Sequence, residues 1–138
     1  TLNPVCPRYI EKNAFDLYFG MADKTMKTIV LHELYHFMFF KKFKEIFPST
    51  DEREFESPHL IWKLSEILPI IVLNDKRLTK IFEPQQEVLV YEDIQKLEIN
   101  GRRVIDLFKD FYDKKKYFED FIRKSYNFLK EHEEDVCF

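Results

Sequence analysis

The sequence predicts an all-α fold: a mainly helical single domain that could include one small β-hairpin. Only 2 of its 138 residues are glycine and 6 are proline, so it is poor in the turn residues that β-sandwiches and phosphate-binding loops require. Aromatic residues make up 17% of the chain, with 15 Phe and 7 Tyr, which is enough apolar area for one core. Apolar residues also recur at helical spacing along most of the chain.

The first predicted helices follow from this spacing and from capping residues. Residues 9–21 predict a short helix, and we expect no hairpin within residues 1–23. Asp23 is a candidate N-cap for a long helix over residues 24–46, which ends before Pro48. Residues 41–45 turn polar, so we expect this helix to emerge toward solvent in its second half.

A polar connection over residues 48–58 leads to the next helix. Ser57 and Pro58 suit the N-cap and the first helical position. Apolar residues at helical spacing then continue over residues 59–72, where Pro69 should kink or end the helix. A short helix is expected around residues 77–82, and residues 87–91 fit a strand as well as a helix.

The turn signal Asn100-Gly101 leaves two interpretations open. It can close a hairpin of residues 97–99 with residues 102–104, or it can separate two helices. We favour two helices, because apolar residues continue at helical spacing over residues 104–112. The last helix is predicted for residues 116–133.

Composition argues against several classes of protein. The net charge is −3 with acids and bases interspersed, which does not indicate binding to nucleic acid. No apolar stretch is long enough to span a membrane. Cys6 and Cys137 are too few for a disulfide framework and favour free thiols in a reducing compartment. Without a visible signal peptide, we expect a cytoplasmic protein that binds neither nucleic acid nor membrane.

The chain begins with Thr1 rather than Met. We therefore interpret residues 1–138 as one helical domain that could form the C-terminal part of a longer chain. The sequence predicts no oligomeric state.

The strongest functional signal is the pentapeptide His32-Glu33-Leu34-Tyr35-His36, which reads H-E-x-x-H. Helix positions four apart share one face, so the two imidazoles can bind one zinc ion. Residues 29–38 carry no charge except Glu33, and a carboxylate in such apolar surroundings is costly unless a cation lies nearby. The competing interpretation is a chance match, with two core histidines that have satisfied hydrogen bonds.

This motif resembles the active-site helix of zincin-type zinc metallopeptidases. The metzincin continuation requires Gly and His where this chain has Phe39 and Lys42, so the resemblance is to gluzincins, whose third ligand is a glutamate on a later helix. Glu66 fits this role, because it lies in a mostly apolar stretch 30 residues after His36. The resemblance covers roughly residues 24–72.

One gluzincin feature is replaced. Many members carry an Asp four residues after the ligand Glu, where it hydrogen-bonds the first His, and here that position is Ile70. Metal-bound imidazoles usually donate their second N–H to a carboxylate or carbonyl. Asn74, Asp75 or a backbone carbonyl are the expected substitutes.

The resemblance implies zinc-dependent hydrolysis of a peptide or protein substrate. Zn²⁺ would be held by His32, His36 and Glu66, and Glu33 would be the general base. His59, seven residues before Glu66, is a rival ligand or a catalytic donor to the substrate or transition state. Further candidates for an oxyanion donor are Tyr91 and Tyr126.

A second class remains open beside the peptidase. The chain could be a non-catalytic helical protein-interaction domain, with or without a structural metal. A structural site fills all four positions with protein ligands, which would require both His59 and Glu66. A di-iron bundle needs Glu-x-x-His on each of two helices, and within the predicted helices only Glu33–His36 supplies it.

Overall fold

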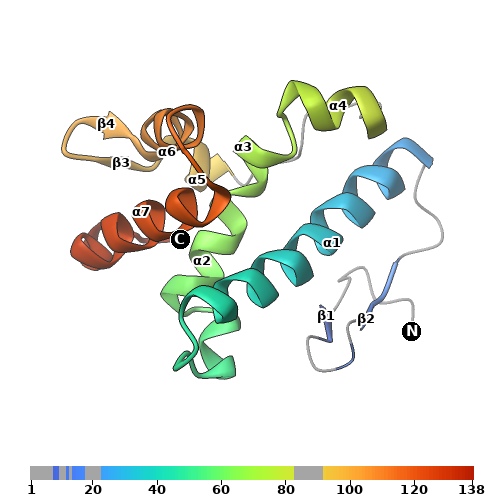
Figure 1. The fold of residues 1–138 in the computed structure, drawn as a ribbon, viewed down its shortest axis with the longest axis horizontal. Helices are drawn as coiled ribbons and strands as arrows, with labels where there is room; N and C mark the ends of the chain where they lie inside the picture. Colours follow the sequence, from blue (N-terminus) through green and yellow to red (C-terminus); the bar gives the residue numbers. More distant parts are fainter. Residues whose placement is uncertain (1–7, 10–11, 13, 18–22, 83–91) are drawn as a thin grey trace.

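The computed structural model describes residues 8–9, 12, 14–17, 23–82 and 92–138. These residues form a mainly helical domain, with one small two-stranded sheet near each end of the molecule (Figure 1). The predicted fold class is therefore confirmed. None of the described helices has the length and apolar character needed to cross a bilayer.

The elements follow one another with short connections. The helices are α1 (Asp23–Ile46), η2 (Glu52–Phe55), α2 (Leu60–Ile67), α3 (Pro69–Val72), α4 (Lys76–Phe82), α5 (Glu92–Lys96), α6 (Val104–Asp113), α7 (Phe118–Glu131) and η3 (Glu133–Asp135). The strands are β1 (Arg8–Tyr9), β2 (Ala14–Phe15), β3 (Glu98–Ile99) and β4 (Arg102–Arg103).

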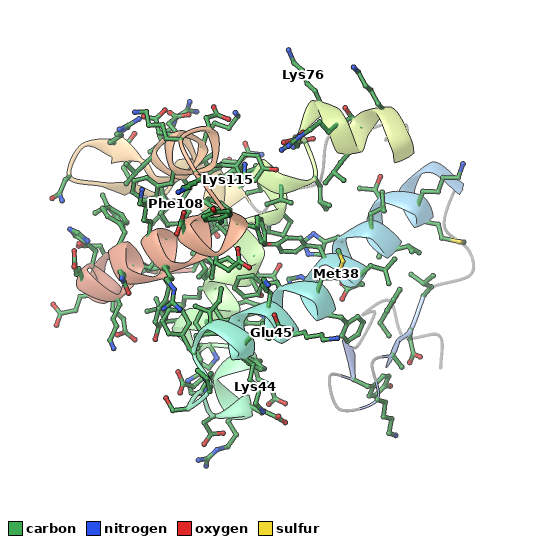
Figure 2. The ribbon with its side chains drawn as sticks, in the orientation of Figure 1. Met38, Lys44, Glu45, Lys76, Phe108 and Lys115 are labelled. Carbon is green, nitrogen blue, oxygen red and sulfur yellow. The ribbon has the colours of Figure 1, made fainter. Side chains whose placement is uncertain are left out.

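Helix α1 confirms the predicted long helix but not its predicted exposure. It begins at Asp23 and ends at Ile46, two residues before Pro48. Lys44 and Glu45 lie at its C-terminal end (Figure 2), and Glu45 is exposed. The second half nevertheless stays in the core, because Phe43 is 0% exposed and Ile46 is also buried. The expectation that this half emerges toward solvent is wrong.

Proline divides the next helical segment as predicted. Helix α2 ends at Ile67, and α3 begins with Pro69 in its first turn, because proline has no N–H to continue the hydrogen-bond ladder. The predicted first helical residue, Pro58, lies two residues before Leu60, where α2 begins. His59 has an extended backbone (φ −67°, ψ 154°) and is the N-cap of α2, so Ser57 and Pro58 precede the helix.

The described residues of the N-terminal segment correct the helix predicted for 9–21. Strand β1 pairs antiparallel with β2, in the register Arg8 with Phe15 and Tyr9 with Ala14. The Phe15 ring lies 6.1 Å from the Phe37 ring of α1. Phe15 thus packs on α1 from a strand, and not from a helix of its own. The expectation that residues 1–23 contain no hairpin is wrong as well.

The Asn100-Gly101 turn closes a hairpin, so our preference for two helices was wrong at this point. Asn100 (φ 54°) and Gly101 (φ 72°) are both left-handed, as a two-residue hairpin turn of type I′ requires. Strand β3 pairs antiparallel with β4, and α6 begins at the next residue, Val104. Residues 87–91 lie outside the described residues.

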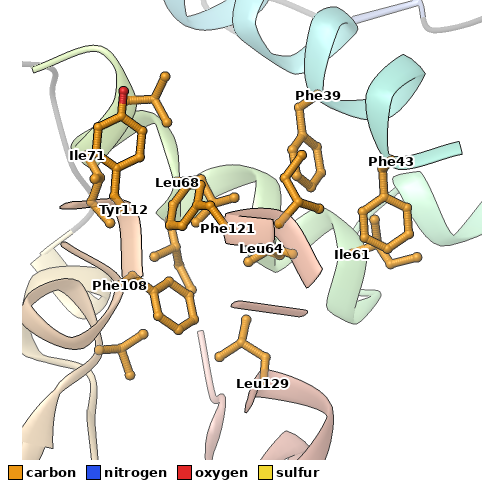
Figure 3. Packing of buried hydrophobic residues seen from close by; sticks show 14 of the residues in the cluster. Phe39, Phe43, Ile61, Leu64, Leu68, Ile71, Phe108, Tyr112, Phe121 and Leu129 are labelled. Atoms are coloured by element: carbon orange, nitrogen blue, oxygen red, sulfur yellow. The ribbon is translucent and has the colours of Figure 1, made fainter. Parts of the chain in front are cut away.

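The core fills the space between α1, α2, α6 and α7. In Figure 3, Phe39 and Phe43 of α1 face the apolar side chains of α2, and Phe108 lies toward Leu129 of α7. The largest side chains with less than 2% exposure include Phe39, Phe43, Ile61, Leu64, Ile67, Leu68, Phe108, Phe121, Ile122 and Leu129. This packing holds α1 and α2 together and fixes the distance between the residues of the candidate site.

Candidate metal centre

Helix α1 brings its two motif histidines to one point. His32 and His36 lie one turn apart, and their Nε2 atoms are 2.8 Å from each other. The rings meet edge to face, with centroids 4.5 Å apart and an interplanar angle of 75°. Both imidazoles therefore direct the same ring nitrogen to a shared position, as the H-E-x-x-H spacing predicts.

Helix α2 supplies the third group. Glu66 places Oε2 3.4 Å from His32 Nε2 and Oε1 3.4 Å from His36 Nε2. One ligand atom from each of the three residues can be chosen so that all lie within 4.8 Å of one another. The structure thus brings together the three residues that the sequence predicts as metal ligands.

The spacing of these atoms fits a metal ion closely. Bonds of about 2.0–2.1 Å in tetrahedral geometry place ligand atoms roughly 3.3 Å apart. The two separations between histidine and glutamate, both 3.4 Å, match this value. The 2.8 Å between the two Nε2 atoms is about 0.5 Å shorter and also corresponds to a hydrogen bond between neutral imidazoles. The residues fit an ion once these two nitrogens separate slightly.

The cluster lies at the boundary of the core. The His36 side chain is 0% exposed and that of Glu66 is 4% exposed, whereas the His32 side chain is 20% exposed. A carboxylate buried to this degree requires a counter-charge or strong hydrogen bonds. Among the three candidate ligands, His32 is the most exposed, so solvent reaches the cluster on its side.

Glu33 follows His32 on the same helix. On an ideal helix it lies about 100° around the axis from His32 and about 60° from His36. Its side chain is half-buried, and its Oε2 atom is buried. Thr28 lies one turn before His32 on α1 and is buried.

The ring of Tyr35 packs in the core behind the cluster. It is 2% exposed and stacks on Phe39 at 6.0 Å. Burial raises the pKa of the Tyr35 phenol well above its ordinary value, and the charges of Tyr112 and Glu66 add to the rise. The phenol therefore stays neutral near pH 7, which suits packing rather than proton transfer.

His59 is not brought to the cluster. It is exposed at the N-cap of α2, seven residues before Glu66, which corresponds to about 10 Å along the helix axis. Tyr126 contacts the rings of Phe43 and Phe47, at the other end of α1 from His32. Tyr91 lies outside the described residues.

The expected substitutes for the missing gluzincin Asp are engaged elsewhere. Asp75 accepts hydrogen bonds from Arg77 and from the Tyr112 hydroxyl at 2.8 Å, and the Arg77 guanidinium holds its pKa far below the usual range. Asn74 Nδ2 donates to the Ile70 carbonyl at 2.7 Å. Among the described hydrogen bonds, neither residue contacts His32.

Two aromatic residues beside the cluster were not singled out from the sequence. The His36 ring stacks on Phe40, and Phe40 stacks on Phe55 of η2. The four-residue spacing between His36 and Phe40 was a readable signal, because it places both on one helix face. Nothing in the sequence connects Phe55 with them.

Comparison with known proteins adds no relative: no family model, no curated protein and no solved structure matches this chain. The resemblance to zincins rests on the motif and stays a prediction.

Proposed function

We propose that this protein is a zinc-dependent hydrolase of peptide bonds, in which His32, His36 and Glu66 hold the metal. The observation that carries the proposal is the convergence of three ligand atoms from two helices within 4.8 Å. Two imidazoles and one carboxylate are a donor set that catalytic zinc sites use. The His36 and Glu66 side chains are only 0% and 4% exposed, which supports a water-poor site, where charge interactions are strong.

Glu33 is the proposed general base. A zinc ion held by the three ligands would supply Lewis acidity toward a carbonyl oxygen and lower the pKa of a water molecule. The carboxylate of Glu33 accepts the proton of the attacking water and passes it to the leaving amine. Its adjacency to His32 on α1 places it beside the ligands without making it one of them.

The ligand count favours catalysis over a structural role. Within the described residues, the cluster contains three candidate ligands, and the side chain of His32 remains 20% exposed. Catalytic zinc sites keep a fourth position for water or substrate, whereas structural sites fill it with a protein ligand. A non-catalytic interaction domain is the second candidate, and exposed Leu34 and Met38 on α1, with 45% and 64% exposure, favour it.

A cytoplasmic location is part of this proposal. Its support is the exposed free thiol of Cys137, which suits a reducing compartment. Cys6 lies outside the described residues.

The decisive experiment separates metal binding from chemistry. Competition with a chromophoric chelator should show about one zinc per chain in the wild type, and His32→Ala and Glu66→Ala should lose it. Glu33→Gln should keep zinc and lose hydrolysis of a mixed peptide library, monitored by mass spectrometry. His59→Ala is the matched histidine control and should keep zinc.

The outcomes divide the candidates clearly. Zinc binding that survives His32→Ala would remove the metal site. Hydrolysis that survives in Glu33→Gln would remove Glu33 as the base. Zinc bound by the wild type without hydrolysis of any library peptide would favour the non-catalytic domain.

A further inference from the structure

A column of three stacked rings ends at one metal ligand. The His36 imidazole lies nearly parallel to Phe40, with centroids 5.9 Å apart and an angle of 18°. Phe40 lies nearly parallel to Phe55, at 4.6 Å and 21°. We call His36, Phe40 and Phe55 the aromatic column. All three side chains are buried, with exposures of 0%, 3% and 3%.

The column connects the ligand to the segment between the two ligand-bearing helices. Phe40 follows His36 by one turn on α1, whereas Phe55 ends η2 in the connection to α2. This 3₁₀ helix is capped by Asp51, whose side chain accepts a hydrogen bond from the backbone N–H of Arg53 at 3.0 Å. The plane of the His36 ring therefore depends on the placement of η2.

Both histidines approach Glu66 at 3.4 Å, but among the described residues the His32 ring has no stacked partner comparable to Phe40. The His32 side chain is 20% exposed, and within the described part of the chain its ring contacts that of His36, edge to face. Rotating the His36 ring would give up its stacked contact with the face of Phe40. Rotating His32 gives up no stacked partner among the described residues.

This difference determines how the cluster opens. The two Nε2 atoms are 2.8 Å apart and must separate to about 3.3 Å around a tetrahedral ion. We propose that Phe40 and Phe55 are positioning residues that hold His36 as the fixed ligand, so that His32 is the ligand that moves when the metal binds. This inference rests on the zinc site proposed above.

Leucine substitutions test the column by removing ring faces while keeping apolar bulk. In Phe40→Leu and Phe55→Leu, we expect zinc affinity to fall about tenfold, as for other groups that orient a metal ligand. The visible spectrum of the Co²⁺-substituted protein should also change, because this spectrum reports ligand geometry. The matched control is Phe108→Leu, since Phe108 is 0% exposed and packs on Phe111 and Phe128. It should lose stability but keep the affinity and the spectrum.

A second measurement uses the wild type and does not depend on the variants folding. Ring-carbon relaxation by NMR in the metal-free protein should show a more ordered imidazole for His36 than for His32. Saturation with zinc should then raise the order of His32 more than that of His36.

The results distinguish this inference from the proposed function. A wild type that binds no zinc overturns both. A wild type that binds zinc, with leucine variants that match its affinity and spectrum, overturns the positioning role and leaves the zinc site intact. Equal order of the two rings in the metal-free protein overturns the assignment of the moving ligand.

Discussion

The two halves of α1 differ in how they are packed, although both are rich in apolar residues. In the second half, buried side chains recur at helical spacing: Tyr35, His36, Phe39, Phe40, Phe43 and Ile46. In the first half, Thr28 is the one buried side chain among residues 26–34, and Ile29, Val30 and Leu31 are half-buried. We call residues 35–46 the packed half and residues 26–34 the open half.

The candidate metal centre lies where these halves meet. His36 belongs to the packed half and His32 to the open half, so one candidate ligand is held by the core and the other is accessible. A catalytic centre needs ligands in fixed positions and also access for substrate. The boundary between a packed and an open segment of one helix meets both needs without a separate loop.

Removing an aromatic side chain from the packed half should have the largest effect. Phe43→Ala is expected to lower the free energy of unfolding by about 3–5 kcal/mol, because it leaves a cavity in the core. Leu31→Ala in the open half should lower it by about 1 kcal/mol or less. Urea denaturation of both variants measures the difference, with exposed Leu34→Ala as the control. Equal losses for Phe43→Ala and Leu31→Ala would erase the distinction between the halves.

Zinc should stabilise the protein by a smaller amount and mainly through the open half. At a free concentration 100 times the dissociation constant, zinc should raise the free energy of unfolding by about 2.7 kcal/mol. Hydrogen exchange should slow more in residues 26–34 than in residues 35–46, because the packed half is already protected. His32→Ala should show neither change. Protection confined to the packed half would contradict the comparison.

The smallest effect concerns Asp75 in the connection between α3 and α4, which accepts a hydrogen bond from Tyr112 of α6 and leaves α1 untouched. Arg77 first, and then the Tyr112 hydroxyl, lower the pKa of Asp75. A carboxyl with a lowered pKa in the folded state stabilises the fold above its unfolded pKa of about 3.9 and loses this contribution as pH falls. Asp75→Asn should therefore lower the free energy of unfolding by about 1 kcal/mol at pH 7. The loss is this small because Arg77 is exposed and solvent screens its charge.

The pH dependence of this variant provides the check. The difference in the free energy of unfolding between wild type and Asp75→Asn, measured by urea denaturation, should be smaller at pH 3 than at pH 6. Zinc affinity at pH 7 should stay unchanged, because Asp75 does not contact the cluster. A change in affinity would show that the support of the packed half extends to the connection between α3 and α4.

Much of the helical framework could be predicted from spacing and capping residues. The bounds of α1 agree with the prediction to within one residue, and the break before Pro69 follows from the missing N–H of proline. The short strands were harder to predict. Phe15 belongs to a two-residue strand that contacts α1. Asn100 belongs to a two-residue turn in which both residues are left-handed.

The sequence by itself determined which residues can share one face of α1. The four-residue spacing of His32 and His36 needs only helical geometry, and this geometry is local. It also indicated Glu66 as a carboxylate in apolar surroundings, since the cost of burying a charge applies in any fold.

Tertiary structure alone decided what the cluster includes. The approach of Glu66 to both histidines depends on how α2 packs against α1, and the column through Phe55 depends on the path of the connection between them. The same packing left His59 at the exposed start of α2. These distances lie between residues that are far apart in sequence. Side-chain packing in the core sets the distances, and no local sequence pattern encodes this packing.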